Sequence, residues 1–391
     1  MTGSEASDAA FLARDAVDCL PEGLLERRLA VGRPLRVKLG LDPTAPDVHL
    51  GHTVVLRKLR EFQDLGHVVV LIIGDYTARV GDPSGRTSTR PVLSGEQIDA
   101  NAQTYVEQAA KVLDCDRIEL RHNSEWLDMA MEELFALART TTVAQLLERN
   151  DFSKRHAARE PISILELLYP LMQAYDSVAV RADVELGGTD QKFNLLLGRD
   201  VQRAYAVAEQ VALTMPILIG LDGERKMSKS LGNQIAVGDG PQEMYGKTLS
   251  LPDGAMADWY ALLLGEPVAP EIGARDAKHA LARRLVERFH SVSAAAEARA
   301  HFDRVFVRHA LPDDIAQACF DASAGSVHMP ALIAASFGRS RSEARRLLGQ
   351  GAVKLDGRTL TDDDLDVLVE RLDDAVLQVG KRGFRRLRRA M

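Results

Sequence analysis

Residues 37–73 read VKLGLDPTAPDVHLGHTVVLRKLREFQDLGHVVVLII, and they predict a strand, a helix and a second strand. The apolar runs 37–41 and 68–73 are typical of strands that are buried on both faces. Between them, residues 53–65 repeat apolar side chains at helical spacing and keep the charges on one face. A strand, helix, strand unit of this kind predicts an α/β fold with a Rossmann-like parallel sheet.

The tetrapeptide His49-Leu50-Gly51-His52 lies at the loop that enters this predicted helix. Free backbone amides and the positive end of the helix dipole favour phosphate at such a position, and doubly wound sheets bind nucleotides in the crevice there. Two histidines three residues apart are also compatible with a packed pair or a metal site. A metal site needs further ligands, and no Cys or His cluster lies nearby in the sequence. We therefore expect a nucleotide site.

A second motif, Lys226-Met227-Ser228-Lys229-Ser230, follows a predicted turn at residues 221–223. At average residue usage, a fixed string of five residues arises in a chain of this length about once in ten thousand cases. The alternative is a solvated basic loop. A mobile basic loop that closes on a pyrophosphate group would link binding to catalysis, because its cations meet the charge that develops in the transition state.

The chain has 391 residues, which predicts two or three domains. Residues 162–176 predict a helix, residues 178–186 a strand, and residues 187–191 a glycine turn before another helix. Beyond position 230 the pattern becomes helical, notably at 256–264 and 274–300, and beyond 328 short strands are predicted at 352–355 and 375–379. We expect a catalytic domain at 1–231, a helical domain at 232–327 and a small α+β domain at 328–391.

The formal net charge of −7 argues against a uniformly basic surface, but the charge is segregated near the end of the chain. The last eleven residues carry six basic side chains and no acid. Residues 361–374 carry seven carboxylates and one arginine, and we expect them to face away from a polyanion.

Three isolated cysteines, Cys19, Cys115 and Cys319, have no CxxC spacing and suit a reducing compartment. The first twenty residues carry four acids and one base, unlike a secretory or transit peptide. The longest apolar run, 68–73, is too short to span a bilayer. We therefore expect a cytoplasmic protein with no membrane partner.

With HLGH and KMSKS, the chain resembles the class I aminoacyl-tRNA synthetases, and further residues make the bacterial type of tyrosyl-tRNA synthetase the nearest family over nearly the whole length. The resemblance implies that His49 and His52 contact the phosphate and ribose of ATP and that Gly51 lets adenine approach. It also implies phosphate contacts from a threonine and from the basic loop: Thr44, Lys226, Met227, Ser228 and Lys229.

Residues 81–86, GDPSGR, form a turn that lacks the spacing of a Walker phosphate loop. The resemblance implies that Asp82 binds the substrate ammonium group. It further implies that Arg86 and Arg90 serve pyrophosphate, although lysine is common at position 86 in relatives.

Tyr169, Gln173 and Asp176 lie on one face of the predicted helix. Three polar groups there are compatible with bonds to neighbouring elements alone, but the resemblance places Tyr169 and Gln173 beside the amino group of tyrosine and Asp176 at its hydroxyl group. Lys38 stands where many bacterial relatives have a tyrosine that also meets the hydroxyl, so it is a further candidate for tyrosine binding.

Asp190 and Gln191 follow two glycines that permit close approach of a ligand. The alternative is an exposed glycine turn. The resemblance implies that this pair contacts the ribose and the amino acid.

The C-terminal part resembles a small RNA-binding domain that occurs in a ribosomal small-subunit protein. Its basic side chains suit phosphate contacts, and a solvated charged helix is the alternative. The candidate RNA-binding residues are Arg341, Arg345, Arg346, Lys381 and Arg382.

The resemblance implies that ATP and tyrosine form tyrosyl-adenylate and that the tyrosyl group then passes to the 3′-terminal ribose of tRNA. It implies magnesium with the ATP, no tightly bound protein-ligated metal, a homodimer, and contact of the helical domain with the anticodon region. Three alternatives stay open: a tryptophanyl enzyme, an RNA-binding protein of synthetase descent without catalysis, and a nucleotidyltransferase that acts on free small molecules.

Overall fold

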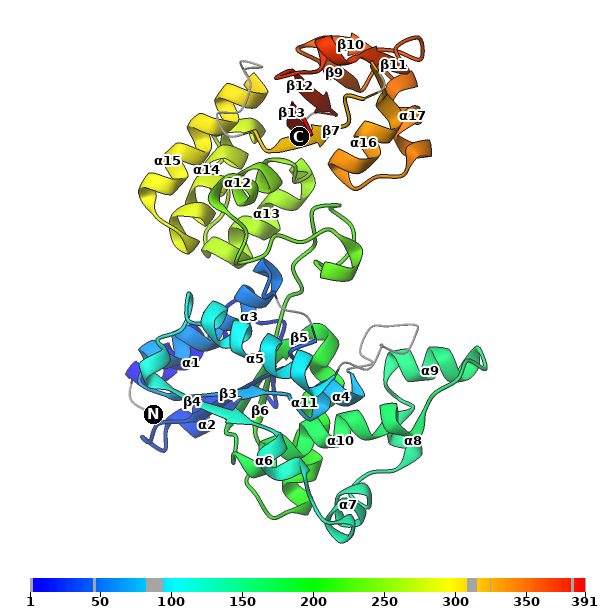
Figure 1. Ribbon diagram of the computed structural model, residues 1–391. Helices are drawn as coiled ribbons and strands as arrows, with labels where there is room; N and C mark the ends of the chain where they lie inside the picture. The colour runs from blue at the N-terminus through cyan, green and yellow to red at the C-terminus, as the bar shows by residue number, and fades with distance from the viewer. Residues whose placement is uncertain are drawn as a thin grey trace. The chain divides into compact units, whose positions relative to one another are not determined.

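The computed structural model describes residues 3–44, 47–81, 94–307, 315–323, 325–380 and 383–390 (Figure 1). The chain divides into two units, Met1–Ala295 and Ala296–Met391. Within the described ranges, no helix combines the length and the apolar character that crossing a bilayer requires.

A six-stranded sheet organises the first unit. Its strand order is β1-β6-β5-β2-β3-β4, and all neighbours run parallel except β1, which is antiparallel to β6. The direction of strand succession reverses beside β2, since β3 lies on one side and β5 on the other. The strands are β1 (Asp18–Leu20), β2 (Arg36–Leu41), β3 (Val68–Ile73), β4 (Ile118–His122), β5 (Val184–Gly188) and β6 (Val211–Met215).

Helices cover this sheet; Figure 1 shows α3 and α5 on one side of it and α6 and α10 on the other. The helices that precede β6 are α1 (Gly3–Ala13), α2 (Leu24–Leu29), α3 (Leu50–Asp64), α4 (Thr77–Val80), α5 (Gly95–Ala109), α6 (Ser124–Leu127), α7 (Met131–Ala138), α8 (Val143–Leu146), α9 (Asn150–Ala157), α10 (Ile164–Ala179) and α11 (Lys192–Ala204). Those that follow it are α12 (Pro241–Leu249), α13 (Met256–Trp259) with a π-helical turn at Tyr260–Leu264, α14 (Ala274–Phe289), and α15 (Val292–Phe302) with a second π-helical turn at Asp303–Val307.

The strand, helix, strand prediction for residues 37–73 is confirmed. Strands β2 and β3 pair in parallel from Arg36 with Val68 to Leu41 with Ile73. Helix α3 begins at Leu50, three residues before the prediction, because the His52 ring caps it: Nδ1 accepts a hydrogen bond from the His49 backbone amide at 3.1 Å.

Two predicted boundaries are wrong. The strand predicted at 178–186 begins only at Val184, because α10 continues to Ala179 and buries Ser177 against the sheet. The helix predicted at 274–300 is interrupted at His290, whose backbone leaves the helical region (φ −131°, ψ −98°). In both places packing overrides the local pattern.

The second unit contains a five-stranded sheet of order β10-β9-β12-β13-β7 and a two-stranded sheet of β11 and β8. Its core gathers apolar side chains from both helices and the sheet, among them Ile333, Leu348, Val353 and Leu377. The elements are β7 (Gln317–Phe320), β8 (Ser326–His328), α16 (Met329–Phe337), α17 (Arg341–Gly349), β9 (Val353–Leu355), β10 (Arg358–Leu360), β11 (Asp366–Leu368), β12 (Val376–Val379) and β13 (Gly383–Arg389). The predicted fold class is confirmed, and the strands predicted at 352–355 and 375–379 are correct to within one residue.

The acidic stretch at residues 361–374 forms ion pairs with the basic end of the chain, and the expectation that it faces away from a polyanion stays a prediction. Asp374 pairs with Arg386 at 3.1 Å and with Arg388 at 3.0 Å, and Asp373 pairs with Arg389 at 3.1 Å. The antiparallel pairing of β12 with β13 brings the two segments together, so opposite charges that are separate in the sequence neutralise each other.

Candidate active site

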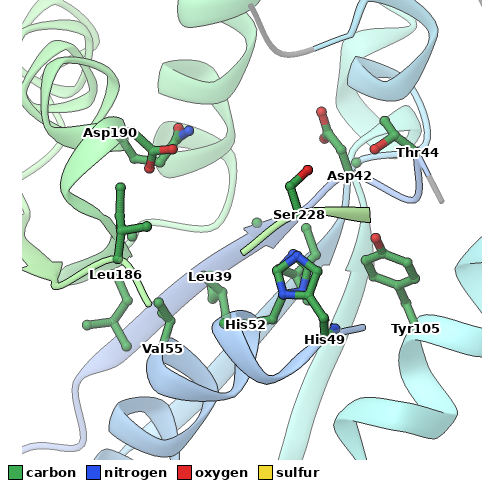
Figure 2. A pocket seen from close by; sticks show the side chains of 18 of the residues that line it. Leu39, Asp42, Thr44, His49, His52, Val55, Tyr105, Leu186, Asp190 and Ser228 are labelled. Atoms are coloured by element: carbon green, nitrogen blue, oxygen red, sulfur yellow. The ribbon is translucent and has the colours of Figure 1, made fainter. Parts of the chain in front are cut away.

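A pocket of about 580 Å³ lies at the carboxyl ends of β2 and β5, beside the point where the strand order reverses. Ligands of open α/β sheets bind at this position. Figure 2 shows Asp190 across the pocket from Asp42 and Thr44. The pocket brings together nearly all described residues that the sequence nominated for ATP and tyrosine: Thr44, His49, Gly51, His52, Tyr169, Gln173, Asp176, Asp190, Gln191, Lys226, Met227, Ser228 and Lys229.

The two signature motifs meet through backbone pairing. Leu50 donates its amide to the Ile235 carbonyl at 3.0 Å, and Val237 donates to the Val48 carbonyl at 2.8 Å. His49 and Ala236 form an antiparallel bridge between these two bonds. The segment that follows KMSKS is therefore joined to the segment that contains HLGH.

The two histidines stack with ring centroids 3.9 Å apart. Burial lowers the pKa of His49 to about 2, and the positive charges of His52, when it is protonated, and of Lys226 add to this effect. Burial is also the main cause that lowers the pKa of His52 to about 4. Both rings are therefore neutral at physiological pH and act as hydrogen-bonding groups. The buried Nδ1 atom of His49 has no hydrogen-bond partner among the described residues, which suits a ligand contact.

A larger residue at Gly51 would crowd the His49 ring. A Cβ atom at this position would lie 3.0 Å from both Nδ1 and Cε1 of His49 and 3.6 Å from Cβ of Met227. The glycine thus lets the first turn of α3 pack directly against the histidine ring.

The KMSKS segment leaves a hairpin whose turn contains Gly223 at φ +75°. Met227 donates its amide to the Leu218 carbonyl at 2.9 Å, which closes the hairpin. Beyond the motif, the buried Asn233 side chain accepts from the Ser228 amide at 2.8 Å and donates to the Lys226 carbonyl at 3.1 Å and to Asp222 at 2.9 Å. One amide side chain therefore holds both sides of the motif.

Each lysine of the motif pairs with a carboxylate at the pocket. The Nζ atom of Lys226 lies 3.1 Å from Asp190, and that of Lys229 lies 2.7 Å from Asp47. The two lysine side chains are 41% and 45% exposed, so solvent and an anionic ligand can compete for them.

At the other end of the pocket, Tyr169 donates its hydroxyl hydrogen to Asp42 at 2.8 Å. The same carboxylate accepts from the Thr77 hydroxyl at 2.7 Å. Gly74 leaves room for this bond, because a Cβ atom there would collide with Asp42 and Thr77. The sequence did not nominate Asp42 as a site residue, although its position directly after β2 is a usable signal.

Asp176 is 3% exposed and accepts a hydrogen bond from the Trp126 indole at 2.8 Å. Burial raises the pKa of Asp176 to about 7; the charge of Lys38 and the hydrogen bonds from Trp126 and Asn123 oppose this rise, and the charge of Glu185 adds to it. A buried carboxylate of this kind favours a ligand that donates a hydrogen bond to it. Trp126 was not nominated, because its neighbourhood in sequence carries no recognisable pattern.

Lys38 is not among the residues that line the pocket. Its ammonium group donates to the Gln173 carbonyl at 2.9 Å and to the Ser177 hydroxyl at 2.7 Å, and it pairs with Glu185 at 2.9 Å. The structure thus places Lys38 behind the α10 face that carries Gln173 and Asp176, rather than in the pocket.

Several nominated residues lie elsewhere. Arg341, Arg345 and Arg346 are exposed on α17 in the second unit. Five others lie outside the described residues: Asp82, Arg86, Arg90, Lys381 and Arg382. Over the described part of the chain, no group of three or more His, Cys, Asp or Glu side chains is arranged to hold a metal ion.

Comparisons with known proteins identify the family. The family model of class I tRNA synthetases for tryptophan and tyrosine matches residues 30–307. The chain is 52% identical to a tyrosine–tRNA ligase of Moorella thermoacetica, over 96% of this chain and 94% of the relative. It is 49% identical to a tyrosine–tRNA ligase of Thermotoga maritima, over 96% of each chain.

Solved structures agree on the fold. The tyrosyl-tRNA synthetase of Archaeoglobus fulgidus, crystallised with L-tyrosine, superposes with a TM-score of 0.62 at 23% identity over 75% of this chain and 99% of that one. The Aeropyrum pernix enzyme gives a TM-score of 0.61 at 20% identity over 76% and 97%. The family resemblance that the motifs indicated is confirmed. The chain belongs to the class I tRNA synthetases for tryptophan and tyrosine, and the full-length relatives described above are tyrosine–tRNA ligases.

Proposed function

We propose that this chain activates tyrosine with ATP and transfers the tyrosyl group to the 3′-terminal ribose of a tRNA. One observation supports the choice of amino acid most directly. The pocket that has HLGH and KMSKS along one part of its wall also contains Asp176, a buried carboxylate suited to a hydroxyl donor. Full-length relatives named tyrosine–tRNA ligase support the same reaction.

In the activation step, a carboxylate oxygen of tyrosine attacks the α-phosphorus of ATP. A carbon–oxygen–phosphorus linkage forms, the bond to the β-phosphate oxygen breaks, and pyrophosphate leaves with the electron pair. No nucleophile of the protein is required, so the chain contributes positioning and charge stabilisation. In the second step a ribose hydroxyl of tRNA attacks the tyrosyl carbonyl, and AMP leaves.

The neutral His49 and His52 rings bind ATP at the start of α3, together with Thr44 and the backbone beside Gly51. Lys226 and Lys229 exchange Asp190 and Asp47 for the phosphates as pyrophosphate forms. The exposure of both lysines supports this exchange, because a solvated ion pair costs about 1 kcal/mol or less to break. Met227 and Ser228 hold the motif in place, and Arg86 and Arg90 add charge to the same phosphates.

Tyrosine binds at the Asp176 end of the pocket. Asp176 accepts a hydrogen bond from its hydroxyl group, Asp82, Tyr169 and Gln173 bind its amino group, and Gln191 contacts the amino acid. Asp190 binds the ribose of ATP once Lys226 has left it.

Magnesium accompanies ATP as a phosphate-bound ion. Of the four described carboxylates at the pocket, Asp42, Asp47 and Asp190 are engaged with a hydroxyl group or a lysine and Asp176 with the Trp126 indole, and they form no three-ligand group. This arrangement fits an ion that takes most of its ligands from phosphates and water. When bound, it supplies charge neutralisation on the leaving pyrophosphate.

We further propose the three-part division at 1–231, 232–327 and 328–391, with tRNA contacts by the helical part at the anticodon region and by the C-terminal part. Arg341, Arg345 and Arg346 present basic groups along α17, and Lys381 and Arg382 extend the candidate surface. The isolated cysteines, which suit a reducing compartment, support a cytoplasmic location.

A homodimer is the proposed assembly. Large apolar side chains are exposed on α7, on α8 and at the start of α10: Met131, Phe135, Val143, Ile164 and Leu165. An exposed apolar group of this kind marks an interface. Ile164→Glu is expected to shift the sedimentation of the full chain from dimer to monomer, while Ile272→Glu, at another exposed apolar residue, leaves it unchanged. A monomeric parent chain would contradict the proposal.

Amino-acid-dependent exchange between ATP and pyrophosphate tests the activation step. Tyrosine, phenylalanine and tryptophan are supplied in separate reactions with the purified full chain. Exchange with tyrosine alone is expected. Exchange with tryptophan would move the assignment to the sister enzyme, and no exchange with any of the three would favour a role in RNA binding or in another nucleotidyl transfer.

Removal of residues 328–391 tests the division of labour. The shortened chain is expected to keep tyrosine-dependent exchange and to lose most of its tRNA aminoacylation, because the basic helix α17 is gone. Equal loss of both activities would contradict an RNA-binding role for this part.

A further inference from the structure

We propose that the buried ion pair of Lys38 and Glu185 is a positioning device for tyrosine recognition: Glu185 orients the Gln173 amide that lines the pocket, and Lys38 supplies the positive charge that faces Asp176 from behind. The inference rests on the proposed function. It assigns a role to two buried charged residues that lie outside the pocket.

The pair is fully enclosed and fully bonded. The side chains of Lys38 and Glu185 are 0% and 1% exposed, and their charged atoms lie 2.9 Å apart. Glu185 also accepts from the Gln173 amide at 3.2 Å, from the Ser177 hydroxyl at 3.1 Å and from the Gln210 amide. A buried ion pair is costly to form compared with apolar side chains of similar volume, so its presence calls for a role besides stability.

Glu185 determines which way the Gln173 amide points. The nitrogen of this amide donates to Glu185, and its oxygen accepts from the Asn194 side chain at 2.9 Å. With the two ends distinguished, the amide cannot flip without losing both bonds. The oxygen keeps a second lone pair for a donor in the pocket, such as the ammonium group of an amino acid.

Lys38 lies against the turn of α10 that carries Asp176. It bonds to the carbonyl of Gln173 and to the hydroxyl of Ser177, which lie on either side of Asp176 in sequence. The groups that act on Asp176 are Lys38 on β2, Glu185 on β5, and the neutral donors Trp126 and Asn123. Lys38 favours the ionised form of Asp176 and Glu185 opposes it.

This geometry resolves how a lysine at position 38 serves hydroxyl recognition. The side chain does not reach the ligand. Instead, it keeps Asp176 available as a charged acceptor, and its partner Glu185 keeps Gln173 in register with the same ligand. Both are positioning residues and neither is catalytic.

The charge part is tested by the pH dependence of kcat/KM for tyrosine in ATP–pyrophosphate exchange, which reports groups of the free enzyme. Lys38→Met removes a positive charge that favours ionised Asp176. It is therefore expected to move the acidic limb of the pH profile, where kcat/KM falls as Asp176 gains a proton, to higher pH. Glu185→Gln removes a negative charge and is expected to move it to lower pH. Each shift should be at least about half a pH unit.

The double variant Lys38→Met/Glu185→Gln should have its limb between those of the single variants. Glu185→Gln leaves Lys38 without its counter-ion, just as Lys38→Met leaves Glu185, whereas the double variant leaves neither charge unpaired. If Lys38→Met does not fold, the double variant compared with Glu185→Gln isolates the effect of Lys38. The limb of the double variant should then lie at higher pH than that of Glu185→Gln.

The matched control is Glu166→Gln, which removes a buried charge from α10, the helix that also carries Asp176. Glu166 pairs with Arg155 at 2.7 Å and lies about 15 Å from Asp176 along α10, at about 1.5 Å per residue. This variant is expected to lose stability and to keep the acidic limb of the parent. Single variants that shift in the same direction, or not at all, would overturn the charge part of the proposal.

The orientation part is tested by comparing Lys38→Met/Glu185→Leu with Lys38→Met/Glu185→Gln. The first lacks an acceptor for the Gln173 amide, and the second keeps one. The KM for tyrosine should be about tenfold higher in the first, corresponding to one hydrogen bond, with the KM for ATP alike in both. Equal KM values for tyrosine would overturn it. Absence of tyrosine exchange in the parent chain would instead refute the proposed function.

Discussion

Lys38 and Lys229 each hold a carboxylate within 3 Å, at 2.9 Å from Glu185 and 2.7 Å from Asp47, yet their surroundings are opposite. Lys38 is fully buried, whereas Lys229 is 45% exposed. A short distance therefore does not distinguish a permanent ion pair from an exchangeable one. Burial does, because a buried charge that loses its partner keeps its desolvation cost, while an exposed charge regains water.

The two pairs lie at sites with different tasks. Around Lys38, the polar groups of β2, β5 and α10 are committed to one another, which suits a fixed recognition surface. Around Lys229, the partners are few and solvated, which suits a group that moves to a ligand during the reaction. The comparison predicts that mutations at the first site damage the fold and that mutations at the second damage the rate.

The largest effect is expected from Lys38→Met. This change leaves the buried Glu185 without its counter-ion, so the free energy of unfolding should fall by about 3–5 kcal/mol. Equilibrium urea unfolding at pH 7.5 measures it. The double variant Lys38→Met/Glu185→Gln should recover most of the loss. A single variant as stable as the parent would show that the pair is exchangeable after all.

Next in size is the effect of Lys229→Ala on the rate. It should lower kcat of ATP–pyrophosphate exchange roughly a hundredfold, as expected when one group that meets transition-state charge is lost. The melting temperature should remain unchanged. Lys192→Ala, which breaks a half-exposed pair with Asp18 that is not part of the pocket lining, is the control and should leave both quantities unchanged. A Lys229→Ala protein with parental kcat would contradict the assignment.

A smaller effect concerns pH. Burial raises the pKa of Asp176 to about 7, so this carboxylate gains a proton as the pH falls through neutrality. The ratio of kcat/KM for tyrosine to that for phenylalanine should therefore be about tenfold lower at pH 6 than at pH 8. His49 and His52, with pKa values of about 2 and 4, stay neutral over this range and add nothing. A ratio that is constant with pH would show that Asp176 does not read the hydroxyl group.

The same raised pKa fixes the sign of the effect on folding. Asp176 is ionised more easily in the unfolded chain than in the folded one, so its ionisation opposes folding as pH rises from about 4 to 7. The contribution of neutral Asp176 to the stability of the fold is fully present below about pH 4 and is lost as the pH rises to about 7. The difference in unfolding free energy between Asp176→Asn and the parent should accordingly be more favourable to the variant at pH 8 than at pH 4.

The smallest effect is expected from Asp47→Asn. Because the Asp47 pair with Lys229 is solvated, its loss should change stability by less than about 1 kcal/mol. The freed lysine should lower the KM for ATP by no more than about threefold. Steady-state exchange at varied ATP measures this, with Asp18→Asn as the matched variant. A higher KM for ATP would mean that Asp47 assists the nucleotide rather than competing with it.

The sequence predicted the fold where hydrophobic pattern and signature motif agree. The 37–73 unit and the pocket residues on α3, α10 and the KMSKS segment are examples. It failed at residues 178–183, since alternating apolar residues fit a strand locally while the end of α10 packs there as helix. The local pattern of apolar residues gives no information about that packing.

The sequence predicted the site residues that belong to recognisable motifs. It did not predict those whose role depends on contacts with residues far away in the chain. Asp47, Trp126, Glu185 and Asn233 come from four separate parts of the chain and acquire their roles only through partners such as Lys229, Asp176, Lys38 and Ser228. Lys38 shows the converse. Its alignment with a ligand-contacting tyrosine suggested the pocket, but a long cationic side chain next to a buried glutamate turns toward that glutamate instead.

The anchoring of the KMSKS segment has an entropic consequence. Its entry is fixed by the bond from Met227 to Leu218, and its exit by Asn233 and by the pairing of residues 235–237 with 48–50. Ligand binding thus has only the few residues between these anchors to immobilise, and each ordered residue costs about 1–2 kcal/mol of chain entropy. The segment can move toward phosphate and return at little thermodynamic cost, because most of its disorder was already removed when the chain folded.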